Sequence, residues 1–407
     1  MFLKSALRIL SLLFFSSIVF TSLQAQITAG KWDASLKLND STEMPFRMEI
    51  EKLNSEYQYI VYNAKEKIIL KNETQDSDSI ILNFPDFNSV FKFKPTTGQL
   101  NGYWINYNRG TDYRIPFEAK KVSKEKKEKS ITNFDFTGRW KTTFDVNTPD
   151  SSLAIGVFNT KNNQITGTFL TETGDYRFLE GKVNGNKLIL SGLDGSHAFL
   201  FTGEIINGKI LGNFYSGIHY SGKWSAVMDG EFELQNPEKI TYLTSQDPIK
   251  FELKDLEGND YTFPNDQVKD KIVIIQIMGT WCSNCIDETK FLSELYNKYH
   301  SQGLEIISIG YETPTTFEGQ AKKIKLLQTR HNLNFHFLVG GKADKKLVSQ
   351  HFPMLNSISS YPTSIFIDRN GNVVKIHTGF NGPGTGVVYD NFVKETDELI
   401  KKLINQP

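Results

Sequence analysis

Apolar and polar residues follow two different patterns along the chain, and the pattern changes near residue 230. The first part contains short segments with alternating apolar and polar residues, at 35–38, 47–51, 57–62, 79–82 and 90–93. Alternation with a period of two is typical of half-buried strands, and the Asn, Asp, Gly and Pro residues between the segments favour turns. This part of the chain is therefore predicted to be all-β.

Two sequence patterns in the β region occur twice. The tripeptide Gly-Lys-Trp at residues 30–32 is echoed by Gly-Arg-Trp at residues 138–140. Further along, Gly-Gln-Leu-Asn-Gly-Tyr-Trp at residues 98–104 is echoed by Gly-Lys-Ile-Leu-Gly-Asn-Phe at residues 208–214. Such self-similarity indicates a diverged tandem repeat of two β modules. We expect each module to be a small meander, sandwich or barrel.

From residue 248 onward the pattern changes to alternating strands and helices. Residues 271–278 form a continuous apolar run rich in β-branched residues, as expected for a strand buried on both faces of a sheet. Apolar residues at helical spacing then predict a helix over 284–300. The remaining predicted elements are a hairpin at 251–261, a strand at 303–310, a helix at 317–331, a short extended segment at 334–338, an Asn-Gly hairpin at 361–376 and a closing helix at 389–404.

The predicted domain organisation has two β modules followed by one α/β domain. The β modules are assigned to residues 26–119 and 132–229, and the α/β domain to residues 248–407. Lys and Glu dominate residues 120–131 between the modules, which favours a solvated linker over a basic docking tail. A second linker is predicted at residues 230–247.

Composition narrows the class of protein. A chain of 407 residues is too long for one ordinary core, which agrees with several domains. The 46 basic and 46 acidic residues balance, so the net charge does not indicate binding to nucleic acid or to an anionic membrane. Aromatic residues make up 13% of the chain, which argues against disorder as the dominant state.

The first residues resemble a targeting signal. Lys4 and Arg8 precede a predominantly apolar stretch at residues 9–23, and the small residue Ala25 offers a cleavage point. We expect residues 1–25 to be a cleaved signal peptide, with an uncleaved N-terminal membrane anchor as the alternative. The mature protein is then expected in the periplasm, where disulfides persist.

The only two cysteines of the chain are Cys282 and Cys285, in the sequence Trp-Cys-Ser-Asn-Cys. A structural bridge across two residues would constrain little unfolded chain. A structural zinc site needs about four ligands, and the seven histidines supply no second ligand pair. No metal and no cofactor is therefore predicted, and a reversible redox-active disulfide is favoured.

The cysteines lie where the predicted strand gives way to the predicted helix. Unpaired N–H groups and the helix dipole favour an anion at this position, so the thiolate of Cys282 is expected to be stabilised. Because only a thiolate attacks a disulfide, Cys282 is the expected nucleophile. Cys285, one turn further along the helix, can then resolve the mixed disulfide.

These motifs together resemble a known family. A Trp-Cys-x-x-Cys after an apolar strand, with Tyr361, Pro362 and Thr363 opening a strand-turn-strand far downstream, resembles the thioredoxin fold. Residues 276–288 are similar to the TlpA-like family of exported bacterial protein disulfide oxidoreductases. The resemblance covers residues 248–404 and leaves the β modules unexplained.

The resemblance implies roles for matching residues. It implies that Pro362 is a cis-proline beside the cysteines and that the backbone of Thr363 pairs with an extended substrate segment. Glu288 matches an acidic residue thought to assist proton movement, and Trp281 and Tyr361 are expected on the partner-binding surface. The expected partners are a disulfide-containing protein substrate and a membrane thiol electron donor.

The residues between the cysteines depart from the family pattern. Many relatives have a proline there, whereas this chain has Ser283 and Asn284, and this dipeptide tunes the redox potential. We favour a reductase, but the direction of electron flow stays open. One alternative is an exported binding or scaffold protein with a vestigial redox domain. Another is a thiol peroxidase, for which Thr280 lies two rather than three residues before Cys282.

Overall fold

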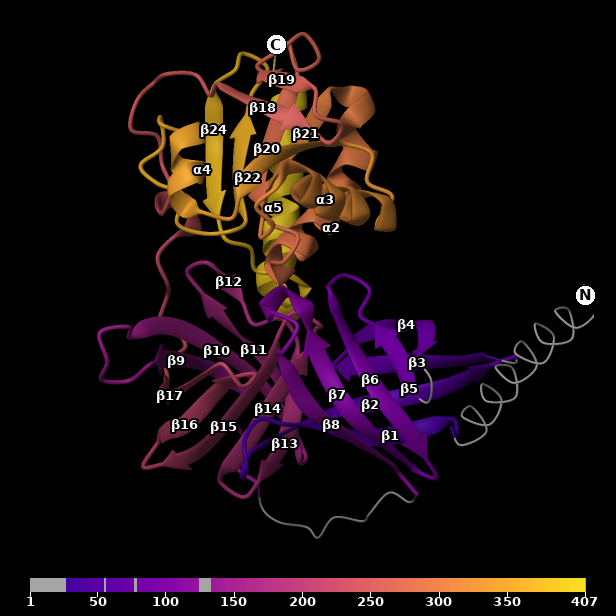
Figure 1. Cartoon of the computed structure of the whole chain (residues 1–407). Helices are drawn as coiled ribbons and strands as arrows, with labels where there is room; N and C mark the ends of the chain where they lie inside the picture. Colours follow the sequence, from indigo (N-terminus) through magenta and orange to yellow (C-terminus); the bar gives the residue numbers. More distant parts are fainter. Residues whose placement is uncertain (1–26, 55, 77–78, 124–132, 407) are drawn as a thin grey trace, which may run out of the picture.

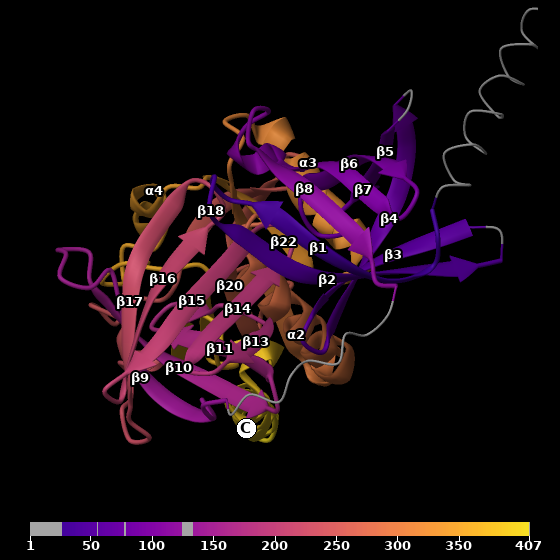
Figure 2. The same cartoon turned by 90° about the horizontal axis from the view of Figure 1, so that it is seen from below.

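The computed structural model describes residues 27–54, 56–76, 79–123 and 133–406. Two β units lie side by side beneath one α/β domain (Figure 1, Figure 2). The predicted signal peptide and residues 124–131 of the predicted first linker lie outside the described residues. The N-terminal region is mostly β and the C-terminal region is α/β, as the sequence predicts. The exact domain boundaries stay predictions.

The first β unit is a closed barrel of eight antiparallel strands. In barrel order they are β1 (Gly30–Lys37), β2 (Glu43–Leu53), β3 (Glu56–Asn63), β4 (Glu66–Asp76), β5 (Ser79–Asn83), β6 (Ser89–Thr96), β7 (Gln99–Asn106) and β8 (Arg114–Lys121). Pairing of β1 with β8 closes the barrel and leaves no free sheet edge. Buried aromatic side chains, among them Trp32, Phe91 and Trp104, fill its interior. The short helix η1 (Tyr107–Arg109) precedes β8.

The second β unit is a nine-stranded antiparallel sheet. Its strands are β9 (Gly138–Phe144), β10 (Ser152–Lys161), β11 (Gln164–Thr171), β12 (Gly174–Asp175), β13 (Leu179–Asn184), β14 (Lys187–Leu193), β15 (Ala198–Ile206), β16 (Lys209–Ser216) and β17 (Tyr220–Met228). Because β10 also pairs with β11, the sheet curls around an aromatic core that includes Trp140, Phe169 and Trp224. The units also share a core, since Leu193 and Leu200 pack with the first barrel.

The two tryptophans of the repeated tripeptides have similar surroundings. Trp32 Nε1 donates to the carbonyl of Thr28 at 3.2 Å, and Trp140 Nε1 donates to the carbonyl of Phe136 at 2.9 Å. Each hydrogen bond therefore spans four residues at the start of its unit. This likeness does not establish that the units are repeats, and the tandem repeat stays a prediction.

The α/β domain is built on a mixed seven-stranded sheet. The strand order is β19 (Asp260–Phe263), β18 (Phe251–Asp255), β22 (His336–Lys342), β21 (Leu304–Glu312), β20 (Ile272–Met278), β23 (Thr363–Ile367) and β24 (Val373–Thr378). The helices are α2 (Ser283–Tyr299), α3 (Phe317–Arg330), α4 (Lys345–His351) and α5 (Val387–Ile404), with single turns η2 (Pro237–Lys239), η3 (His300–Gln302) and η4 (Pro383–Thr385). No helix in the described part of the chain is long and apolar enough to cross a membrane.

The interior strand β20 separates two apolar cores. Ile272, Ile274 and Met278 pack with residues of α2, α3 and α5, whereas Val273 and Ile275 pack with residues of α4 and the opposite face. The strand is buried on both faces, as its continuous apolar sequence predicts. Because the strand is packed on both faces, its C-terminal end at Met278 has a fixed position in the domain. The two cysteines follow a few residues later.

Candidate active site

The two cysteines lie at the start of helix α2. Cys282 is the N-cap residue, and its Sγ accepts a hydrogen bond from the backbone N–H of Cys285 at 3.3 Å. A sulfur in this position lies against the positive end of the helix dipole, where negative charge is stabilised. Both cysteines are free thiols in the structure. The Cys282 sulfur therefore lies at the N-terminus of the helix.

Cys285 has a different environment from Cys282. Cys282 is half-buried, whereas Cys285 is fully buried in the apolar core beneath the helix. Burial, together with the hydrogen bond that its S–H donates to Cys282, raises the pKa of the Cys285 thiol well above its ordinary value. The more accessible sulfur is thus the one that faces the helix N-terminus, and the shielded sulfur holds its proton.

The segment of Tyr361, Pro362 and Thr363 lies across from Cys282. The Tyr361–Pro362 peptide bond is cis, and Cys282 Sγ lies 3.6 Å from the carbonyl oxygen of Tyr361. Thr363 begins β23 and lies between Ile277 of β20 and Thr378 of β24. Both edges of Thr363 thus face strands of the domain itself, so the accessible backbone beside the cysteine is that of Tyr361.

Glu288 lies on α2, one turn beyond Cys285, and is fully buried. Its carboxylate accepts hydrogen bonds from Gln276 Nε2 at 2.8 Å and from Ser364 Oγ at 2.9 Å. The same Gln276 nitrogen lies 3.4 Å from the carbonyl oxygen of Cys285. Burial raises the pKa of Glu288 to about 7, so this carboxyl can gain or lose a proton near neutral pH. A buried group that titrates there beside a thiol suits proton transfer.

Trp281 packs beside the cysteines and contacts the cis-proline segment. Its ring lies edge-on to Tyr361 with the centroids 5.5 Å apart, and its Nε1 donates to the carbonyl of Tyr311 at 3.0 Å. A second buried acid, Glu312, accepts hydrogen bonds from the backbone N–H and the hydroxyl of Thr280 at 2.7 and 2.8 Å. Burial raises the pKa of Glu312 to about 7, although the sequence pattern did not single it out.

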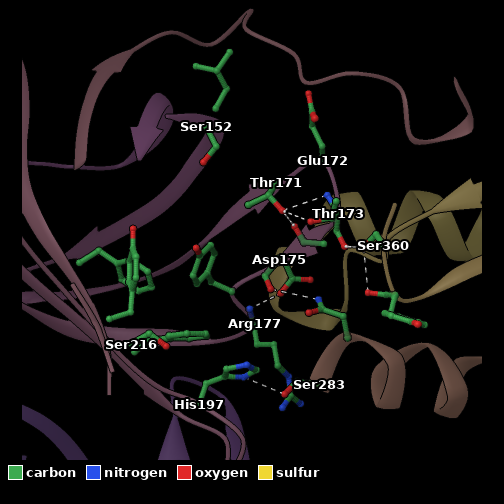
Figure 3. Close-up of a pocket in the computed structure, with 18 of the residues that line it drawn as sticks. Ser152, Thr171, Glu172, Thr173, Asp175, Arg177, His197, Ser216, Ser283 and Ser360 are labelled. Atoms are coloured by element: carbon green, nitrogen blue, oxygen red, sulfur yellow. Dashed lines mark hydrogen bonds between the residues drawn. The ribbon is translucent and has the colours of Figure 1, made fainter. Parts of the chain in front are cut away.

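The second β unit contacts the two residues between the cysteines. Ser283 Oγ donates to Asp194 Oδ2 at 2.7 Å. The same oxygen lies 3.3 Å from His197 Nδ1 (Figure 3). Asn284 Nδ2 donates to the backbone carbonyls of Asp175 at 3.3 Å and Phe380 at 3.0 Å. The dipeptide between the cysteines is thus contacted by a separate part of the protein.

A single arginine connects three parts of the chain. Arg177 pairs with Asp287 of α2 at 2.9 Å, with Glu66 of the first barrel at 2.8 Å, and with Asp194 at 3.3 Å. Burial raises the pKa of Asp287 and of Glu66 despite the arginine. Burial alone would raise the pKa of Asp194 as well. The charges of His197 and Arg177 outweigh this effect and hold the pKa of Asp194 below its usual range. The cluster joins both β units to the redox helix.

Sequence reasoning could not find this contact between the domains. The hydrogen bonds from Ser283 to Asp194 and from Arg177 to Asp287 join residues that are 89 and 110 positions apart. Ser283 and Asp287 belong to the predicted motif and helix, but no motif or periodicity marks Arg177 or Asp194 as their partners. Within the described residues, no group of three His, Cys, Asp or Glu side chains is placed to hold a metal ion.

Comparison with known proteins agrees with the site. Residues 245–376 match the model of the AhpC/TSA family. A thiol-disulfide oxidoreductase ResA of Halalkalibacterium halodurans is 30% identical over 158 residues, which are 38% of this chain and 74% of the relative. The ResA protein of Geobacillus thermodenitrificans is 29% identical over 142 residues, covering 35% of this chain and 73% of the relative.

Among solved structures, a thiol:disulfide interchange protein of the thioredoxin family from Chlorobium tepidum is similar to 40% of this chain and 99% of its own, with 19% identity and a TM-score of 0.30. The match covers most of the α/β domain, including the cysteines, and ends before helix α5. The sequence resemblance is thus confirmed. Through its C-terminal thioredoxin-like domain, the chain belongs to the ResA/TlpA-like family of thiol-disulfide oxidoreductases.

Proposed function

We propose that the protein is an exported oxidoreductase that reduces disulfides in other proteins. The observation that supports this most is the pair of unlike thiols, with Cys282 at the N-terminus of α2 and Cys285 buried one turn later. A more accessible nucleophile and a shielded resolving thiol are what a two-step exchange needs. We propose export through a signal peptide at residues 1–25, with an N-terminal anchor as the alternative.

The proposed reaction transfers two electrons from the dithiol to the substrate. The Cys282 thiolate attacks one sulfur of the substrate disulfide, forms a mixed disulfide and expels the other sulfur as a thiolate. Cys285 then attacks Cys282 Sγ, which releases the second substrate thiol and leaves a Cys282–Cys285 disulfide. A dithiol donor, which we place at the membrane, would reduce this disulfide again.

Glu288 is proposed as the proton acceptor for the second step. Cys285 holds its proton strongly because its thiol is buried, yet only its thiolate can attack Cys282. The nearby carboxyl, with a pKa of about 7, can accept that proton near neutral pH. The hydrogen bonds from Gln276 and Ser364 fix the carboxylate in place while leaving lone pairs on its oxygens.

Substrate binding is proposed at Trp281, Tyr361, Pro362 and Thr363. An extended substrate segment would lie along the cis-proline turn, beside Cys282. Because Thr363 is flanked by strands on both sides, we propose that Tyr361 supplies the backbone contact nearest the reacting sulfur and that Thr363 supports it. Trp281, packed edge-on against Tyr361, would cover the other side.

Two alternatives make different predictions. In a thiol peroxidase Thr280 would have to assist Cys282, but its hydroxyl donates to Glu312 at 2.8 Å. An exported binding protein with a vestigial redox domain would not need its cysteines. The test is the reduction of insulin by the wild type, by Cys282→Ala and by Cys285→Ala. Loss of activity in Cys282→Ala supports the proposal, whereas Cys282-dependent consumption of peroxide without insulin reduction would favour the peroxidase.

A further inference from the structure

A cavity of about 940 Å³ lies between the second β unit and the first turn of α2 (Figure 3). Its lining includes Thr171, Tyr176 and Phe199 from the β unit and Ser283, Asn284 and Tyr361 from the α/β domain. We call this cavity the interdomain cleft. Neither the family match nor the cysteine motif accounts for it, because the β unit supplies most of its wall.

The interdomain cleft begins beside the reacting sulfur. Ser283 and Asn284 directly follow Cys282, and the carbonyl oxygen of Tyr361 lies 3.6 Å from Cys282 Sγ. The hydrogen bonds of Ser283 to Asp194 and of Asn284 to Asp175 hold this part of the lining against the β unit. A substrate sulfur bonded to Cys282 would therefore place the neighbouring substrate residues at the cleft.

One wall of the cleft is aromatic. The rings of Tyr176 and Phe199 have centroids 5.0 Å apart, those of Phe199 and Phe214 are 5.8 Å apart, and His197 stacks on Phe199 at 4.6 Å. Tyr176 and Phe199 are half-buried although they pack against the core of the unit. Half-buried rings that line a cavity favour an apolar side chain as the occupant.

The charges of the lining do not select an anion. The lining includes two arginines, Arg109 and Arg177, and the carboxylate of Glu172, whereas burial raises the pKa of Asp175 to about 7. The Arg177 guanidinium is already bound by three carboxylates, including that of Asp287. A small anionic disulfide or a phosphate would thus meet no excess of positive charge among the described lining residues.

The volume of the cleft limits the size of the occupant. Clefts that bind small ligands measure about 300–1,000 Å³, so this one can hold a few residues of extended chain but no folded domain. We propose that the interdomain cleft binds the extended polypeptide segment next to the substrate's cysteine and selects an apolar side chain there, which rests on the oxidoreductase function proposed above. The second β unit is then a specificity element of the enzyme.

The experiment blocks the cleft without touching the cysteines. Ser152 begins β10, and Glu172 lies in the turn between β11 and β12. Both residues line the cleft and are exposed, so Glu172→Trp and Ser152→Trp should fold while filling part of the cleft. Glu231→Trp, at an exposed position that does not line the cleft, is the matched control. Equal urea midpoints would confirm that all variants are folded.

The probes are three disulfides of 2-mercaptoethanol: bis(2-hydroxyethyl) disulfide, and two short peptides whose single cysteine carries the mercaptoethanol group and is preceded by Phe or by Ser. Pre-reduced protein, freed of reductant, is mixed with each probe, and the loss of its thiols gives a second-order rate constant. We expect the wild type and Glu231→Trp to react with the Phe peptide at least ~10-fold faster than with the Ser peptide.

Both blocking variants should lose this preference and should react with bis(2-hydroxyethyl) disulfide within about twofold of the wild-type rate. No preference in the wild type, an undiminished preference in both blocking variants, or an equal loss on all three probes would overturn the cleft proposal while leaving the oxidoreductase function intact. A wild type that reacts with none of the probes would overturn the proposed function itself, and the cleft proposal with it.

Discussion

Replacing Arg177 by methionine should weaken the contact of the β units with the redox helix and destabilise the protein. Methionine replaces the apolar stem of the arginine side chain but not its charge. Glu66, Asp194 and Asp287 then lose the cation that they share. The side chains of the three carboxylates are only 15%, 8% and 8% exposed. Removing one partner of a buried ion pair costs about 3–5 kcal/mol of unfolding free energy, because the remaining charge stays buried.

The matched control is Arg47→Met. Arg47 also binds a carboxylate through two hydrogen bonds, both 2.6 Å long, to Glu180, but its side chain is 56% exposed. The Glu180 side chain is only 14% exposed, but it keeps a hydrogen bond from the backbone N–H of Ala64 at 3.0 Å, and water reaches Arg47, so loss of Arg47 should cost less than loss of Arg177. Urea unfolding followed by tryptophan fluorescence compares the two variants. With a slope of about 3 kcal/mol/M, Arg177→Met should lower the midpoint by on the order of 1 M and Arg47→Met by much less.

The effect of Arg177→Met should also depend on pH. Burial already raises the folded-state pKa of Glu66 and Asp287, and loss of the arginine raises both further. A carboxyl whose pKa is raised on folding destabilises the protein fully above the folded pKa and not at all below the unfolded pKa. The deficit should therefore be largest at neutral pH and shrink as the pH falls toward about 4. Equal midpoints for the two variants, or a deficit independent of pH, would refute this reasoning.

Two further predictions concern the proton acceptor and the β unit. Glu288→Gln removes a carboxyl with a pKa of about 7, so release of substrate from the mixed disulfide should slow ~10²-fold and lose its rise through neutral pH in stopped-flow fluorescence; a rise that persists would exclude this role. In Gly212→Ala, the added Cβ would lie 2.0 Å from the carbonyl oxygen of Thr202, so the variant should lose about 1–3 kcal/mol of stability in urea, whereas Gly230→Ala, with no atom within 4 Å, should change it by under about 0.5 kcal/mol. Similar losses in the two glycine variants would contradict the steric argument.

The parts of the structure that depend on local sequence could be predicted. The strand at residues 271–278 became β20, the helix at 284–300 became α2, and the Asn-Gly hairpin became β23 and β24. Each signal came from periodicity or turn residues within one segment. The same reasoning missed α4, whose seven residues include only one buried position, Val348. So short a helix leaves too weak a periodic pattern to detect.

The parts that depend on contacts between distant segments could not be predicted. The pattern left meander, sandwich and barrel open for the first β unit, and closure depends on the pairing of β1 with β8. Most aromatic residues of the second β unit pack in its core, but Tyr176 and Phe199 also line the interdomain cleft. Nothing local marks a side chain that faces another domain.

The most direct test of the central claim is to trap the reaction midway. Cys285→Ala should attack a protein disulfide through Cys282 and remain covalently bound, because no second thiol can release the substrate. Mass spectrometry of the protein isolated from cells under non-reducing conditions should identify substrate peptides attached at Cys282, and the Cys282→Ala/Cys285→Ala variant should hold none. Absence of any protein attached to Cys282 in the single variant would contradict the account.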